Sequence, residues 1–254
     1  MMRKVLILTC IACLSGVAIG QAPRVTLPKQ IYLATTDWCP YACEDQADQK
    51  SGIVHEYLTQ LFAAQGIILN IQFFPWSRAI EEANKGRVDG LLTAVYAEAP
   101  DLVFTHTPTM AYGVCFFTEE YTSWQYKGLA SLQQINLAVI QDYGYGQPVD
   151  GYIKEASAGK LTVIASGGIN RLSRMLIAGR VDAFVGDSNV VAWLLKTKRN
   201  LPRQVGCLPE NPFYIAFNSN RPWVKEIVNK LDIWLNTARN QLKLKGIKQE
   251  YLGL

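Results

Sequence analysis

Apolar residues recur along the chain at two spacings, which together predict short strands alternating with amphipathic helices. The runs 31–35, 67–74 and 88–93 are typical of buried strands. The apolar positions of 53–62, and those of a segment that starts at Pro75 and runs to 83, fit one face of a helix. Strands and helices in this order predict an α/β protein with parallel sheets.

A second region of the chain repeats this plan. It is predicted to contain three strands, 137–140, 161–165 and 181–185, and two helices, 149–158 and 169–178. The heptapeptide Gly-Arg-Val-Asp-Gly-Leu-Leu at 86–92 is also echoed by Gly-Arg-Val-Asp-Ala-Phe-Val at 179–185. Two copies are too few for a solenoid, so we interpret them as two lobes on a common plan.

The last part of the chain adds one predicted strand, 213–217, and one predicted helix, 222–235. Two elements cannot bury their apolar faces alone, so we expect them to pack on the first lobe. The chain would then cross between the lobes twice, near 111–117 and 206–213. This interpretation assigns 21–112 plus 212–254 to lobe 1 and 113–211 to lobe 2.

The N-terminus has the pattern of a secretory signal peptide. Arg3 and Lys4 precede a short apolar run, 5–14, and Ala18-Ile19-Gly20 supplies small residues before a cleavage point. The run is too short to span a membrane, which requires about 20 apolar residues. We therefore expect residues 1–20 to be removed during export.

Charge and length limit the class of partner. The formal net charge of +4 falls to +2 when Arg3 and Lys4 are removed, and no dense basic stripe remains. A nucleic-acid partner is therefore not expected. The mature chain is long enough for two lobes with cores of their own.

Four cysteines remain after the leader, namely Cys39, Cys43, Cys115 and Cys207. Export favours disulfides, and Cys39–Cys43 is our first choice as the local pair. A Cys-x3-Cys pair can also bind metal, but zinc sites need more ligands and the mature chain has only His55 and His106. We expect no metal and no cofactor. Cys115 and Cys207 fall in the two crossings, as either a second bridge or two buried free thiols.

Several short motifs occur in a characteristic order. They are Asp37-Trp38-Cys39-Pro40-Tyr41, Phe74-Pro75-Trp76-Ser77-Arg78-Ala79, the two Gly-Arg-Val-Asp strands and Gly186-Asp187. Together they resemble the extracellular solute-binding proteins of family 3, which serve polar amino acid uptake by ABC transporters. The similarity covers essentially the whole mature chain.

The resemblance implies a type II periplasmic binding protein fold, in which two α/β lobes are joined by two hinge strands. A small-molecule ligand would lie in the cleft and closure would occur by hinge bending. It further implies a periplasmic monomer that is not an enzyme. Its partner would be an ABC permease or a membrane sensor.

Ligands of open α/β sheets lie beyond the carboxyl ends of the strands, so residues just after the strands are the candidate contacts. In lobe 1 these are Asp37, Trp38, Tyr41, Trp76 and Arg78. The aromatic rings could stack on a ligand, and Arg78 could bind a carboxylate through two hydrogen bonds. Alternatively, the rings pack in the core and Arg78 pairs with an acidic side chain at the surface.

In lobe 2 the candidates are Tyr143, Tyr145 and Asp187. The family places a small polar loop that grips the ligand's carboxylate where Tyr143 and Tyr145 stand, and an acidic residue that receives its amino group at Asp187. A structural turn remains an alternative for the tyrosines. A helix N-cap is the alternative for Asp187, and both of its roles can coexist.

One segment departs from the family pattern. Amino-acid binders carry an arginine after the third strand, whereas residues 94–101 contain none and include Glu98. A buried Glu98 without a cation would be protonated or would meet a positive ligand group. This predicts a ligand with an aromatic or cationic part.

Two other functions remain open. The fold is shared by a periplasmic cyclohexadienyl dehydratase, for which Glu98 or Asp187 would have to serve as a general acid in the cleft. A stand-alone sensory receptor would show the same sequence features as a transport protein.

Overall fold

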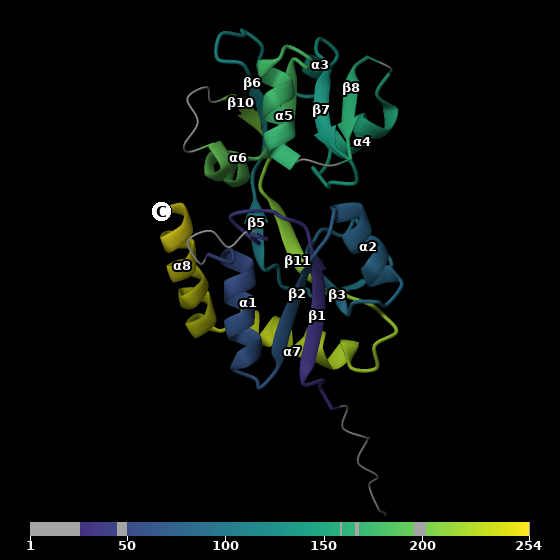
Figure 1. The fold of residues 1–254 in the computed structure, drawn as a ribbon, viewed down its shortest axis with the longest axis vertical. Helices are drawn as coiled ribbons and strands as arrows, with labels where there is room; N and C mark the ends of the chain where they lie inside the picture. The colour runs from purple at the N-terminus through teal and green to yellow at the C-terminus, as the bar shows by residue number, and fades with distance from the viewer. Residues whose placement is uncertain (1–25, 45–49, 158, 166–167, 196–201, 254) are drawn as a thin grey trace, which may run out of the picture.

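The computed structural model describes residues 26–44, 50–157, 159–165, 168–195 and 202–253. The predicted signal peptide, 1–20, lies outside these residues. Two α/β lobes, each built on its own sheet, stand one above the other (Figure 1). Among the described residues, no helix is long and apolar enough to cross a membrane.

Lobe 1 is built on a six-stranded sheet with the order β2-β1-β3-β11-β4, in which β5 also pairs with β11. β1, β2 and β3 are parallel, and β11 runs antiparallel to β3. The strands are β1 Gln30–Thr35, β2 Ile68–Phe73, β3 Gly90–Ala94, β4 Val103–Phe104, β5 Met110–Tyr112 and β11 Asn211–Phe217. The helices are α1 Ile53–Ala63, α2 Trp76–Asn84, α7 Val224–Leu235 and α8 Ala238–Leu252.

Lobe 2 is built on a five-stranded sheet with the order β10-β6-β9-β7-β8. β7 lies parallel to β8 and β9, while β6 is antiparallel to β9 and β10. The strands are β6 Val114–Thr118, β7 Leu137–Ile140, β8 Leu161–Ile164, β9 Ala183–Asp187 and β10 Arg203–Cys207. The helices are α3 Leu129–Leu132, α4 Val149–Glu155, α5 Gly168–Ile177 and α6 Ser188–Leu195.

The repeated Gly-Arg-Val-Asp motif has the same structural role in both lobes. The Asp89 carboxylate accepts a hydrogen bond from the Tyr32 backbone N–H at 2.8 Å, and Asp182 accepts one from the Asn136 N–H at 2.7 Å. The backbone N–H of each aspartate in turn donates to the carbonyl oxygen of the same partner residue. Each aspartate therefore ties its own strand to the neighbouring one, and the strands proper begin one residue after it, at Gly90 and Ala183.

The chain passes between the sheets twice, from β5 to β6 and from β10 to β11. A disulfide joins Cys115 in β6 to Cys207 at the end of β10, so the bridged alternative for this pair holds. The predicted bridge between Cys39 and Cys43 is also present.

Three helices were not among the predicted elements, namely α3, α6 and α8. α6 follows β9 directly, and α8 packs against α1 through few buried side chains, including Leu244, Ile247 and Tyr251. The rest of the α8 sequence is polar, so its apolar periodicity is weak. Its helical ends are nevertheless well marked, by the Thr237 side chain at the N-cap and by left-handed Gly253 after the last turn.

Candidate ligand-binding cleft

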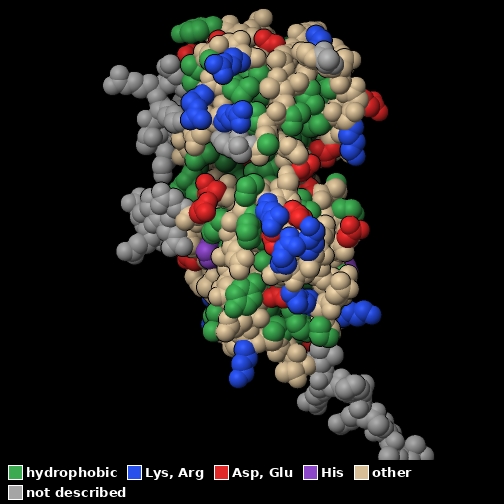
Figure 2. Space-filling view, turned by 45° about the vertical axis from the view of Figure 1, so that its right-hand side comes forward, with side chains coloured by type: hydrophobic (Ala, Val, Ile, Leu, Met, Phe, Trp, Pro, Cys, Tyr) green, Lys and Arg blue, Asp and Glu red, His purple; other side chains and the backbone are tan. Residues whose placement is uncertain are grey.

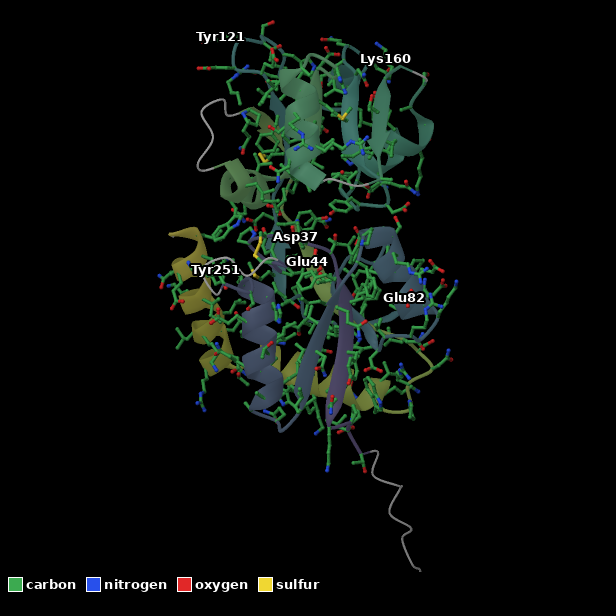
Figure 3. All side chains as sticks on the ribbon, viewed as in Figure 1. Asp37, Glu44, Glu82, Tyr121, Lys160 and Tyr251 are labelled. Carbon is green, nitrogen blue, oxygen red and sulfur yellow. A yellow bond between two sulfur atoms is a disulfide. The ribbon has the colours of Figure 1, made fainter. Side chains whose placement is uncertain are left out.

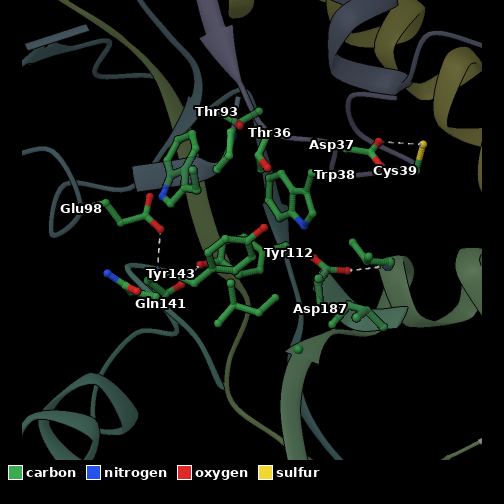
Figure 4. A pocket seen from close by; sticks show the side chains of 18 of the residues that line it. Thr36, Asp37, Trp38, Cys39, Thr93, Glu98, Tyr112, Gln141, Tyr143 and Asp187 are labelled. Atoms are coloured by element: carbon green, nitrogen blue, oxygen red, sulfur yellow. Dashed lines mark hydrogen bonds between the residues drawn. The ribbon is translucent and has the colours of Figure 1, made fainter. Parts of the chain in front are cut away.

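A pocket of about 440 Å³ lies between the two lobes (Figure 4). Its walls come from the carboxyl ends of the parallel strands in both sheets, as the topology of open α/β sheets requires. Residues from lobe 1 include Thr36, Asp37, Trp38, Trp76, Thr93, Glu98, Tyr112 and Phe213. Residues from lobe 2 include Ile140, Gln141, Tyr143, Gly144, Tyr145, Asn170, Asp187 and Val190.

An aromatic cluster forms one wall of the pocket. The Trp38 ring lies edge-on to Tyr112 and Phe213, with ring centroids 5.3 and 5.2 Å away. Tyr41 lies 4.4 Å from Trp38 and is fully buried, and it does not line the pocket. The structure thus places Trp38 at the cleft surface and Tyr41 behind it.

Trp76 and Arg78 point in opposite directions from α2. Trp76 is buried and lines the pocket, whereas the half-exposed Arg78 pairs with Glu81 at 3.0 Å and with Glu82 at 2.5 Å. Figure 3 shows Glu82 on α2 away from the opposite lobe. Two residues two positions apart on a helix are turned by about 200° from each other. The structure therefore places Arg78 in the alternative, ion-paired position outside the pocket lining, while Trp76 occupies the inward face.

Asp187 ends β9 and lines the pocket while also capping α6. Its Oδ1 accepts backbone hydrogen bonds from Asn189 at 2.7 Å and Val190 at 3.0 Å. Its Oδ2 accepts the Tyr41 hydroxyl at 3.0 Å. Burial raises the pKa of Asp187 to about 6, partly offset by these donors. The helix-capping interpretation thus holds, and the same carboxylate is available to the cleft.

Glu98 lies on the segment that departs from the family pattern. Its carboxylate accepts the Val95 N–H at 3.1 Å and the Gly144 N–H of lobe 2 at 2.5 Å. Burial raises the pKa of Glu98 to about 7, against the lowering effect of these two donors and of Trp76. The Glu98 residue is only partly buried, and it belongs to the pocket lining.

The two lobe 2 tyrosines have different surroundings. The Tyr145 hydroxyl accepts the Ile140 backbone N–H at 2.8 Å and so fixes the loop that follows β7. Tyr143 is less buried, and burial together with the Glu98 charge raises its pKa to about 12, against a lowering effect of Thr36 in lobe 1. Both residues line the pocket, but Tyr145 already has a structural partner.

The charges on the pocket wall are all of one sign. Asp37, Glu44, Glu98 and Asp187 line it, and none of the described lining residues is a lysine, arginine or histidine. Figure 3 shows Asp37 and Glu44 at the edge of lobe 1 that faces lobe 2, and Figure 2 shows acidic side chains at the constriction between the lobes. In the part of the chain that the structure describes, no group of histidine, cysteine and acidic residues could hold a metal ion.

The lobes are in direct contact across the cleft. Besides the bonds of Glu98 and Asp187, Ser77 Oγ donates to Asp142 at 2.5 Å, and the Tyr112 hydroxyl donates to the Gly144 carbonyl. The Trp193 and Tyr251 rings also stack at 6.0 Å. These contacts join the two lobes around the pocket.

No protein-family model matches the chain, and no curated protein matches it. Solved structures do. The chain is similar to an ancestral arginine-binding protein bound to arginine, with a TM-score of 0.74, 18% identity and coverage of 90% of this chain and 100% of that one. It is also similar to a histidine kinase sensor domain resembling periplasmic binding proteins, with a TM-score of 0.74, 19% identity and coverage of 88% and 96%.

A third similar structure is a putative L-cystine ABC transporter protein from Listeria monocytogenes, with a TM-score of 0.72, 16% identity and coverage of 88% and 96%. The chain therefore has the type II periplasmic binding protein fold, as the motifs predicted. At these identities the likeness establishes the fold, and amino-acid-binding proteins are prominent among its structural neighbours.

Tyr112 and Phe213 were not among the predicted site residues. Both belong to the strands at the crossings, where β5 pairs with β11. The aromatic residue at each crossing could have predicted these two site residues from the sequence, because the crossing strands of a two-lobed protein form the back of its cleft.

Proposed function

We propose that this protein is a periplasmic solute-binding protein that captures a small organic molecule, an amino acid or a derivative of one, and delivers it to an ABC transporter. The observation that supports this most strongly is a pocket walled by both lobes, with hydrogen bonds between the lobes around it. Such an aromatic pocket with a few convergent polar groups is typical of small-molecule sites. Ligand binding and lobe closure would then be one event.

The test is ligand capture with closure. Protein prepared from the periplasm is analysed by native mass spectrometry, and the recovered ligand is titrated back into refolded, ligand-free protein. We expect stoichiometric binding, a smaller radius of gyration in X-ray scattering, and a change in tryptophan fluorescence because Trp38 and Trp76 line the pocket. A matched variant is Trp234→Phe, which removes a tryptophan of α7 outside the pocket lining and should leave the fluorescence change in place.

A binding protein returns its ligand unchanged, whereas the dehydratase alternative would release a new product. Chromatography of the recovered ligand after prolonged incubation distinguishes the two. A ligand that is chemically altered, or the absence of any ligand and of any closure, would contradict the proposal.

A sensory role is the second candidate, and the similarity to a histidine kinase sensor domain favours it. Reconstitution with the permease distinguishes the two roles. A transport protein in its liganded form stimulates the ATPase of the transporter, and a purely sensory one does not.

A further inference from the structure

We propose that the captured ligand is an organic cation without a carboxylate. The reason is that the Glu98 carboxylate already accepts the Gly144 backbone N–H of lobe 2, a donor that a ligand carboxylate would need. This inference rests on the proposed function and names the ligand class of the same pocket. The class is that of amines with an aromatic or aliphatic body, as opposed to amino acids.

The first step concerns the hydrogen-bond donors of the pocket. A ligand carboxylate needs donors or a cation, because a buried anion without them is costly. The N–H groups of Val95 and Gly144 are both used by Glu98. The N–H groups of Asn189 and Val190 are both used by Asp187. Two pairs of backbone donors in the cleft thus already hold protein carboxylates.

The second step concerns the fit between Glu98 and the lobe 2 loop. A Cβ at Gly144 would lie 3.0 Å from Glu98 Oε1 and 2.6 Å from a Val95 methyl group. Any larger residue at this position would push the loop away from the glutamate. The absence of a side chain at Gly144 therefore permits the close approach that places its N–H on the Glu98 carboxylate.

The third step concerns charge. Glu98 and Asp187 lie on opposite sides of the pocket in Figure 4, with Trp38 and Tyr143 between them. A ligand carboxylate brought between these two would be a third negative group and would meet like charges in a poorly solvated space. A cation there is attracted by both carboxylates and by the faces of the aromatic rings. The described lining supplies no competing positive side chain.

The fourth step concerns the direction of the pH dependence. Burial raises the pKa of both Glu98 and Asp187, to about 7 and about 6. A bound cation favours their ionised forms and lowers both pKa values, so affinity for a cation rises with pH across this range. A carboxylate ligand favours protonated Glu98, so its affinity falls with rising pH. The two ligand classes give opposite slopes.

The charged and titratable groups around these carboxylates do not reverse this sign. Glu98 is affected by Asp150 of α4 and in turn affects Tyr112, Tyr143 and Tyr145, whose own pKa values lie well above neutrality. Asp187 bonds to the hydroxyl of Tyr41, whose pKa is also raised by burial. None of these tyrosines titrates near neutral pH.

The experiment is calorimetric titration of ligand-free protein with matched pairs that differ by one carboxylate: tyramine and tyrosine, tryptamine and tryptophan, agmatine and arginine, cadaverine and lysine. We expect an amine to bind at least about 100-fold more tightly than its amino acid at about pH 8. Its affinity should fall about tenfold or more on lowering the pH to about 5.5, while the ammonium group stays charged.

Two variants locate the effect. In Glu98→Gln the amine should lose about tenfold or more in affinity, and the preference over the amino acid should narrow, because the neutral amide removes one negative charge. Glu119→Gln is the control, because it removes an exposed carboxylate of lobe 2 outside the pocket and should change neither quantity. Circular dichroism checks that each variant is folded, and the slope of the wild-type affinity with pH needs no variant.

Amino acids that bind as tightly as the amines, or an affinity that falls with rising pH, would overturn the cation inference and leave the capture function standing. If no amine of the panel binds, the ligand recovered by native mass spectrometry decides. A carboxylate-free cation supports the inference, and a molecule with a carboxylate overturns it. No recovered ligand and no closure would overturn the capture function as well.

Discussion

The two lobes share a scaffold motif and differ in the segments beyond it. Asp89 and Asp182 each fasten a central strand to its neighbour through the same pair of backbone bonds. Beyond the motif, Glu98 of lobe 1 accepts a hydrogen bond from a backbone N–H of lobe 2, while Asp187 of lobe 2 accepts one from the Tyr41 hydroxyl of lobe 1. The comparison teaches that the residues common to both lobes fasten neighbouring strands within each sheet. The residues peculiar to each lobe form the hydrogen bonds between the lobes and line the cleft.

The largest expected effect comes from breaking the scaffold motif in lobe 1. Asp89→Ala removes the acceptor of Tyr32 and also the ion pair with Arg221 at 2.8 Å, so it should lower the free energy of unfolding by about 3 kcal/mol. Asp182→Ala removes a more exposed carboxylate and should cost about 1 kcal/mol. Urea unfolding measures both values. Equal losses would show that the two copies of the motif are energetically equivalent.

The next effect is the pH dependence of stability due to Glu98. Its pKa is raised to about 7 in the folded protein, so the native state holds the proton more tightly than the unfolded state does. The contribution is fully present below the unfolded pKa and is lost as pH rises through about 7. Between about pH 5 and pH 8 we expect wild type to lose about 2 kcal/mol more than Glu98→Gln does. Urea unfolding at the two pH values gives the difference, and identical slopes would contradict it.

A smaller effect on stability is expected from removing the hydrogen bond between the Tyr41 hydroxyl of lobe 1 and Asp187 of lobe 2. Tyr41→Phe removes the hydroxyl that Asp187 and Asn189 share and keeps the ring in the Trp38 cluster. Unfolding should become easier by about 1 kcal/mol, and ligand affinity should fall because closure has lost an interlobe bond. Calorimetry and urea unfolding measure the two quantities. An unchanged affinity would mean that this bond does not contribute to closure.

The smallest effect is expected at Arg78. Arg78→Ala should leave ligand affinity unchanged and lower stability by less than about 1 kcal/mol, since Arg78 is half-exposed and Arg87 still pairs with the buried Glu82 when Arg78 is removed. Trp76→Ala, two positions away, should abolish most of the affinity because that ring lines the pocket. A loss of ligand affinity in Arg78→Ala would contradict this and would show that Arg78 contributes to ligand binding.

Periodicity and turn signals predicted the alternation of strands and helices and the two crossings between sheets. They did so because buried faces repeat at the spacing of the element that carries them. The bridge between Cys39 and Cys43 was also predictable, from export and from the local spacing.

The side-chain direction within the candidate site was not predictable to the same degree. Trp76 and Arg78 both follow a strand, and only the phase of α2 decides which of them faces the cleft. Tyr41 is close to Trp38 in sequence, yet it lies one layer deeper because of the aromatic cluster around it. The partner of Glu98 comes from a loop 46 positions away, which no local pattern encodes.

The disulfide between Cys115 and Cys207 has a mechanical consequence. It ties together β6 and β10, the two lobe 2 strands that lead into the crossings, so both crossings are anchored at one covalently fixed point. Independent twisting or sliding of either connection is thereby suppressed. The closure proposed for ligand capture therefore bends both connections together.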